Sequence, residues 1–349
     1  MAENVFIFGA GASADCGAPV MSNFLQIAED IVESGSLKND AIRELEKVFA
    51  LRNDLRRIYA NSDLDLDNIE ILFGITEMAR ILNILGNHSP DEINNLNRAL
   101  KRLIIETLEK SIKFPYKDRS IRPPSTYDKF VKKMLVNDYG SIKTNTSVIT
   151  FNYDLALDYA LNYHGVSIDY GFSKRNDAVT LLKLHGSINW VKSKNSGQIN
   201  ILELDNHLRN AQKNFLGNIT EVELRISQDL NKHFSTDENE DIPFIVPPTW
   251  NKSEYNTLVT NVWNRAALEI SKARNIYIIG YSFPKSDSFF KYLYALGTID
   301  NDKIRRLWVV NPDSQVEISN RYEEILGSHI KGKYQYINSS FSEFIGKLE

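Results

Sequence analysis

Five short segments of this chain place small or hydrogen-bonding residues directly after an apolar run. Each run predicts a β-strand, and in an open α/β sheet ligands bind beyond the carboxyl ends of the strands. An imidazole at such a position can act as a general base, and amide or hydroxyl groups can hold a polar ligand. The five segments are Gly9–Ser13, Asn152–Asp154, His185–Ser187, Gly280–Ser282 and Asn311–Asp313.

The first of these segments, Gly9–Ser13, carries the clearest local pattern. It follows the apolar run Val5–Phe8 and alternates glycine with small residues. Glycines permit a tight strand-to-helix turn and the close approach of a ligand, and the N–H groups of a helix start can receive a phosphate. The spacing also fits the general dinucleotide-binding fingerprint. A tight turn with no ligand is the alternative for this segment.

The other segments also have structural alternatives. Asn152 and Asp154 could form an Asx turn and cap a helix that begins near Leu155. His185 could lie in a buried turn with its hydrogen bonds satisfied. The two later segments contain residues that are common in ordinary turns.

The surrounding sequence predicts the sheet that must hold these segments. From Ser147 to the end of the chain, apolar runs alternate with helical patterns such as Leu258–Ile270 and Asp287–Leu296, apart from a polar stretch at 191–241. This alternation predicts an α/β, Rossmann-like fold with a mostly parallel sheet and helices on both faces. The expected strands after the first are Val148–Phe151, Thr180–Leu184, Phe244–Val246, Ile276–Ile279, Leu307–Val310 and Tyr334–Ile337.

A helical segment separates the first strand from the others. Apolar residues recur at helical spacing from Phe24 onward, and the pattern continues between residues 40 and 137 without a convincing strand. Ser89-Pro90-Asp91-Glu92 has the serine, proline and glutamate of a helix start. The acidic run Asp63–Asp67 is expected to be a loop or cap before a helix, with a metal site as the less favoured alternative. We therefore expect a catalytic domain formed by 1–34 and 141–349, and a helical insertion module at 35–140.

Composition excludes several classes of protein. The 349 residues carry a net charge of −4, which gives no basic footprint for nucleic acid, and Arg52, Arg56 and Arg57 are expected to form a solvated helix face. Cys16 is the only cysteine, so an internal disulfide and a multi-cysteine zinc site are excluded. No apolar stretch is long enough to span a membrane, and no secretion signal is evident, so we expect a cytoplasmic protein with no membrane partner.

Several of these motifs, taken in order, resemble the sirtuin-like superfamily. The likeness is closest to the bacterial branch that consumes NAD in anti-phage defence, and it covers most of residues 4–30 and 145–315. The segments that carry it are Gly9–Ser13, Gly17–Pro19, Thr150–Asp154, Leu184–Ser187, Gly280–Pro284 and Val310–Asn311.

The resemblance implies that NAD is the substrate. Asn152 would bind the ribose or hold the attacking water, and His185 would act as general base toward a ribose hydroxyl or that water. Asp154 would accept a hydrogen bond from the carboxamide of nicotinamide. The other contacts with NAD would come from Gly9, Ala10, Gly11 and Ser13 at the phosphates, from Gly280, Ser282 and Asn311 on the adenosine side, and from Ser187.

Departures from the family narrow the expected reaction. Protein-deacylating sirtuins carry a zinc module held by four cysteines, which this chain cannot build, so no metal is expected. The usual Phe-Arg pair is also missing, because Val20-Met21-Ser22-Asn23 follows Pro19. Water is therefore the expected acceptor, and the products would be nicotinamide and ADP-ribose, with cyclised ADP-ribose as an alternative. No arginine beside the glycine turn indicates a 2′-phosphate site, so NAD is favoured over NADP.

The resulting hypothesis is a gated, NAD-depleting NAD glycohydrolase that acts in anti-phage defence by abortive infection. Gating would come from homo-oligomerisation, from an activating partner such as an ATPase- or helicase-like subunit, or from a nucleotide-sensing subunit, with the helical module as the contact surface. One alternative is a subunit that binds NAD or ADP-ribose as a sensor without turnover. The other is a zinc-free protein deacylase or ADP-ribosyltransferase.

Overall fold

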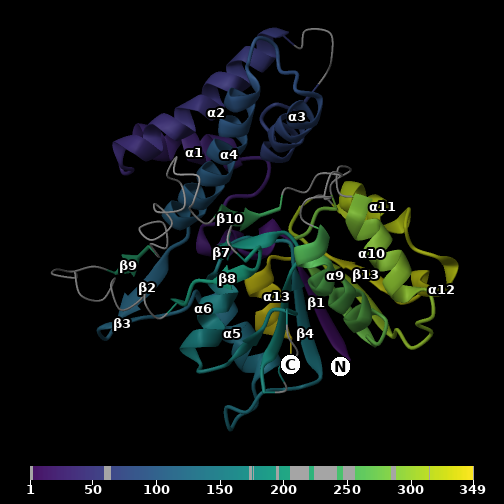
Figure 1. The fold of residues 1–349 in the computed structure, drawn as a ribbon. Helices are drawn as coiled ribbons and strands as arrows, with labels where there is room; N and C mark the ends of the chain where they lie inside the picture. The colour runs from purple at the N-terminus through teal and green to yellow at the C-terminus, as the bar shows by residue number, and fades with distance from the viewer. Residues whose placement is uncertain are drawn as a thin grey trace.

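A parallel β-sheet forms the centre of the chain (Figure 1). The computed structural model describes residues 3–58, 64–172, 175, 177–193, 196–204, 220–223, 242–246, 256–283, 288–313 and 315–348. Within these residues seven strands lie in the order β13-β12-β11-β1-β4-β6-β5, with every neighbouring pair parallel. The strands are β1 (Asn4–Phe8), β4 (Thr146–Thr150), β5 (Ile168–Asp169), β6 (Val179–Lys183), β11 (Asn275–Ile279), β12 (Arg306–Val310) and β13 (Tyr334–Ile337).

The first strand, β1, lies at the switch point of this sheet. The chain passes from β1 to β4 on one side and later continues with β11 on the other side. Loops that leave neighbouring strands in opposite directions open a crevice at the carboxyl ends, which is where open α/β sheets bind ligands. The glycine turn that follows β1 lies at the carboxyl end of this strand.

Helices cover both faces of the sheet, because its strands are apolar on both sides. Val5 and Ile7 of β1 belong to one buried cluster, and Phe6 and Phe8 belong to another. The first cluster includes residues of α9 (Asn256–Ile270), α10 (Ser288–Thr298), α11 (Gln315–Glu323) and α12 (Ser328–Lys331). The second includes residues of α5 (Ser125–Phe130), α6 (Ala156–Tyr163) and α13 (Phe341–Lys347). The predicted α/β, Rossmann-like arrangement is confirmed.

One predicted strand lies in a different sheet. Phe244–Val246 overlaps β10 (Ile242–Ile245), which pairs antiparallel with β7 (Gly186–Lys192) in a three-stranded sheet completed by β8 (Ile199–Ile201). The sequence pattern places Gly186 in the segment that follows a strand, whereas it begins the buried strand β7. A Cβ on Gly186 would lie 2.2 Å from the carbonyl oxygen of Phe244, so glycine permits the close approach of β10.

Four α-helices lie between β1 and β2 (Phe114–Lys117) in the described residues, where the sequence predicts a helical region. They are α1 (Phe24–Glu33), α2 (Asn39–Ile58), α3 (Ile69–Leu82) and α4 (Pro90–Ser111), and α4 begins with the predicted capping box at Ser89 and Glu92. Arg52 of α2 is 8% exposed and pairs with Glu29 of α1, so the expectation of a solvated position there was wrong. Its place on the face of α2 toward α1, where a carboxylate supplies the opposite charge, explains the burial.

The segment before residue 137 also contains strands, contrary to expectation. β2 (Phe114–Lys117) pairs antiparallel with β3 (Ser120–Ile121) and with β9 (Glu221–Val222). These strands are short and one partner lies about a hundred residues away, so local periodicity gave no signal. After β3 the chain returns to the sheet, since α5, which continues as a π-helical turn at Val131–Leu135, packs on α13 and α6. The division into 1–34 with 141–349 and 35–140 stays a prediction.

The acidic run before α3 is a loop in the part that the structure describes, Leu64–Asp67, and the helix itself is capped by Asn68. The described residues contain no group of three or more His, Cys, Asp or Glu side chains that could hold a metal ion. None of the helices in the described ranges is long and apolar enough to cross a membrane.

Candidate active site

A cavity of about 770 Å³ lies at the carboxyl ends of the central strands. It is lined by residues that directly follow β1, β4, β6, β11 and β12, so segments far apart in the sequence meet there. Two predicted site residues, Ser13 and Ser187, do not line it. The predicted site residues that do are Gly9, Ala10, Gly11, Asn152, Asp154, His185, Gly280, Ser282 and Asn311.

The glycine turn after β1 packs directly on the turn after β11. A Cβ on Gly9 would lie 2.7 Å from the carbonyl oxygen of Gly280, and a Cβ on Gly280, which has φ of 63°, would lie 2.1 Å from the nitrogen of Ala12. The N–H groups of Gly9, Gly11 and Ser13 donate to backbone oxygens of the protein. The glycines are therefore required for loop packing in this conformation, in addition to any contact with a ligand. Two 3₁₀ turns, Ala10–Ala12 and Ala14–Cys16, follow β1, and the first α-helix begins only at Phe24.

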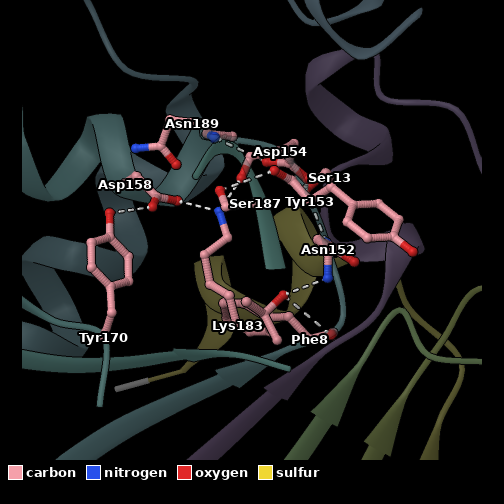
Figure 2. Close-up of polar contacts among 12 residues, drawn as sticks. Phe8, Ser13, Asn152, Tyr153, Asp154, Asp158, Tyr170, Lys183, Ser187 and Asn189 are labelled. Atoms are coloured by element: carbon pink, nitrogen blue, oxygen red, sulfur yellow. Dashed lines mark hydrogen bonds and ion pairs between the residues drawn. The ribbon is translucent and has the colours of Figure 1, made fainter. Parts of the chain in front are cut away.

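Asn152 is held by its amide nitrogen. Its Nδ2 donates to the carbonyl oxygen of Gly9 at 2.9 Å. It also donates to Ser13 Oγ at 3.2 Å, a contact that Figure 2 shows. Both amide protons are therefore used by the protein. The group that Asn152 can offer a ligand in the cavity is its oxygen, which accepts hydrogen bonds from water or from a hydroxyl.

Ser13 lies beneath the cavity floor and joins three elements. Its Oγ donates to Asp154 Oδ2 at 2.7 Å and accepts from Asn152. Tyr127 of α5 lies 2.8 Å from the same oxygen, and because the single proton of Ser13 goes to Asp154, the tyrosine must be the donor. Burial raises the pKa of Tyr127 well above its usual value, which keeps the phenol protonated as a donor.

Asp154 is a buried carboxyl whose two oxygens both have protein partners. Oδ1 accepts from the backbone N–H of Ala156 at the start of α6, and Oδ2 accepts from Ser13. Burial raises the pKa of Asp154, while the charge of Lys183 and the two hydrogen bonds oppose the rise. The Asx contact that the sequence offered as an alternative is present. A contact between Asp154 and a carboxamide stays a prediction.

His185 reaches the cavity from the strand next to Asn152. It follows β6, which pairs with β4, and the residue is 4% exposed. The ring packs edge-on against Phe151, with centroids 5.1 Å apart, and its backbone oxygen accepts from the N–H of Val246. Ser187, two residues on, donates to the backbone oxygen of Tyr153 and is fully buried outside the cavity.

The far end of the cavity is formed by the turns after β11 and β12. Asn311 is 4% exposed, and its Oδ1 accepts from the N–H of Asp313 in an Asx turn. Arg321 of α11 also lines the cavity, donates to the backbone oxygen of Ser282 at 3.1 Å and pairs with Glu317. Sequence reasoning missed Arg321, because no local signal shows which side of α11 faces the turns.

Helices α3 and α4 form a further wall of the cavity that was not predicted. The lining residues there come from the loop before α3, from its first turns and from the C-terminal half of α4. They are Asp65, Asn68, Ile69, Glu70, Ile71, Phe73, Ile104 and Leu108. The helical region therefore contributes directly to the candidate site.

No family model matches this chain, and no curated protein matches it. Among solved structures, the chain is similar to a Sir2 homologue–NAD complex, with 14% identity and a TM-score of 0.44 over 98% of this chain and 86% of that chain. It is also similar to Sir2Tm bound to a propionylated peptide, with 14% identity and a TM-score of 0.41 over 99% of this chain and 90% of that chain. Because both TM-scores are below 0.5, the fold and the site described above rest on the geometry of this chain alone.

Proposed function

We propose that this protein is an NAD glycohydrolase, which cleaves the bond between nicotinamide and ribose. The observation that carries the proposal is that Asn152 and His185 line one cavity from neighbouring parallel strands, together with the glycine turn. The cavity volume of about 770 Å³ lies within the range of roughly 300–1,000 Å³ that is typical of ligand and cofactor sites.

In this mechanism the C–N bond between the anomeric carbon and nicotinamide breaks, and neutral nicotinamide leaves. The ribose then has oxocarbenium character, as in glycoside hydrolysis. The Asn152 oxygen accepts a hydrogen bond from water and orients the water lone pair toward the anomeric carbon. As the new C–O bond forms, the water proton passes to His185 and then to solvent. NAD and water thus give ADP-ribose, nicotinamide and a proton.

Water is the proposed acceptor because the chain has one cysteine and no zinc module of four. NAD is the proposed substrate, and Arg321 at the far end of the cavity makes NADP the comparison to test. The proposal extends to the role in the cell, in which gated NAD depletion acts in anti-phage defence. A second copy of the chain or an activating partner would contact the helical region. Light scattering with and without that partner measures whether the protein assembles. A constitutively active monomer would contradict this part.

The central test follows the release of nicotinamide from NAD and from NADP by chromatography, with ADP-ribose and its cyclic form resolved as products. His185→Ala and Asn152→Ala should each lower turnover at least about 100-fold, which is the lower end of the usual contribution of a general base. His329→Ala, at an exposed position, is the matched control and should keep wild-type turnover.

Circular dichroism of each variant verifies that the fold is intact. If His185→Ala keeps more than about a tenth of wild-type turnover, the catalytic assignment is wrong. If the wild-type protein, alone and with any partner, binds ADP-ribose but releases no nicotinamide, the sensor alternative replaces the enzyme.

A further inference from the structure

A charged side chain lies inside the protein directly behind the candidate catalytic residues. Lys183 is the last residue of β6, two positions before His185, and its side chain is 1% exposed. Moving an ammonium group out of water is costly unless opposite charge and hydrogen bonds replace the water. The partners of Lys183 therefore indicate what the lysine does.

The contacts of Lys183 connect two segments. Its Nζ donates to the backbone oxygen of Asp154 at 2.5 Å and to Asp158 Oδ2 of α6 at 3.0 Å (Figure 2). Tyr170 donates its hydroxyl proton to Asp158 Oδ1 at 2.6 Å, so both oxygens of this buried carboxylate are engaged. Figure 2 shows the resulting chain from Tyr170 through Asp158 and Lys183 to the backbone at Asp154.

Lys183 hydrogen-bonds to the backbone of the segment that carries Asn152. Residues 151–155, which we call the Asn152 loop, have neither helical nor strand structure and lie between β4 and α6. Lys183 binds this loop from the strand that ends just before His185. The lysine therefore fixes the loop relative to the histidine.

We propose that Lys183, Asp158 and Tyr170 are positioning residues, which set the distance between the Asn152 amide and the His185 imidazole. None of the three lines the cavity, so they act through the loop and not by touching the substrate. This inference rests on the proposed function for its kinetic consequence, because a shift of about 1 Å at a reacting group can lower the rate about 100-fold.

A purely structural ion pair would behave differently. Replacing a buried polar cluster by apolar side chains of similar volume is often neutral for folding. The triple variant Lys183→Met/Asp158→Leu/Tyr170→Phe removes every charged or hydroxyl group of the cluster together and should therefore fold. It also removes the donor to the Asp154 carbonyl, so the Asn152 loop should no longer be held by a hydrogen bond from β6.

The matched control removes a buried ion pair elsewhere. Arg265→Met/Glu269→Leu deletes the pair on α9, in which Glu269 is as buried as Asp158. Two readouts are measured on both variants and on the wild-type protein: the kcat and KM for nicotinamide release, and the hydrogen exchange of a peptide that covers residues 151–156.

The expected result is a fall in kcat of about 10- to 100-fold in the triple variant, with KM for NAD within about threefold, and exchange in the loop at least about tenfold faster. The control should keep both values. Tyr170→Phe alone should give a smaller effect, since Lys183 still holds the loop.

Unchanged loop exchange in the folded triple variant, or a kcat equal to that of the control, overturns the proposal. If the wild-type protein releases no nicotinamide, the proposed function fails, and the exchange of the loop still decides whether the three residues position it.

Discussion

The hydrogen-bonded hydroxyl of Ser13 makes a quantitative prediction. Ser13→Ala removes the donor to Asp154 Oδ2 and the acceptor of the Tyr127 proton, and both partners are buried. Leaving one buried polar group without its partner costs about 1–3 kcal/mol, and more when the group is charged. With two buried groups affected, the free energy of unfolding should fall by about 2–6 kcal/mol.

The matched control is Ser147→Ala in β4. Ser147 is as buried as Ser13, but no group in the described residues hydrogen-bonds to its Oγ. The same change of atoms there should cost less than about 0.5 kcal/mol, or stabilise the protein, since no hydrogen bond is lost. Urea unfolding followed by circular dichroism measures both variants, and equal losses for the two serines would refute the assigned hydrogen-bond network.

The loss of stability in Ser13→Ala should depend on pH, which provides a second test of the same hydrogen-bond network. Burial raises the pKa of Asp154 above its ordinary value of 3.8, and the Ser13 bond opposes the rise. The folded state therefore favours the protonated carboxyl, and stability falls as pH rises from 3.8 through the folded pKa. Without Ser13 the ionised form becomes costlier still, so the loss in Ser13→Ala should grow as pH rises through that window. A loss that shrinks with rising pH would contradict the assignment.

Three further predictions concern single positions. Gly280→Ala should lower the free energy of unfolding by at least about 2 kcal/mol, because the position combines a positive φ with a backbone clash. Gly165→Ala is the control, since Gly165 has a positive φ but open space around it, and this change should cost about 1 kcal/mol. Urea unfolding of both variants measures the difference. Cys16 should react with a thiol reagent at least about 100-fold more slowly in the native protein than in denaturant. The reason is that burial raises the pKa of its thiol, with a smaller contribution from the charges of nearby aspartates. Fast labelling of the native protein would contradict this. A hydrogen bond from Arg102 lowers the pKa of Asp40, so Asp40→Asn should destabilise the protein by at most about 1 kcal/mol at pH 7. The difference in the free energy of unfolding between this variant and the wild-type protein should vanish as pH falls below 3.8 through the folded pKa of Asp40. A difference that is independent of pH in unfolding experiments would refute the pair.

The strand ends were predictable because the physical rule behind them does not need the strand order. Apolar runs buried on both faces predict parallel strands, and all such strands end at one edge of the sheet. Asn152 and His185 therefore had to lie at the same edge, and β4 and β6 are neighbours in the structure. The start of β7 was not predictable, because a glycine after an apolar run usually indicates a turn. Here Gly186 instead permits the close approach of β10.

The contacts beneath the site were not predictable, since they depend on how elements dock. Ser13, Tyr127 and Asp154 come from three separate segments, and nothing in their spacing indicates that they meet. Lys183 did leave a signal, because a lysine stands inside an otherwise apolar run, and such a residue needs a buried partner. That signal predicts an ion pair but not its partner, which depends on the side of α6 that faces β6.

The wall that α3 and α4 form has a consequence for the gating hypothesis. α4 packs against α1, α2 and α3, so the four helices form one packed unit, and residues of α1, α3 and α4 line the cavity directly. Packed helices move as units and not residue by residue, because their interfaces are close-packed. A partner or a second copy that shifts this unit would thus change the width of the cavity that Asn152 and His185 also line. Gating through the helical region therefore needs no additional element to reach the site, because that region is already part of its wall.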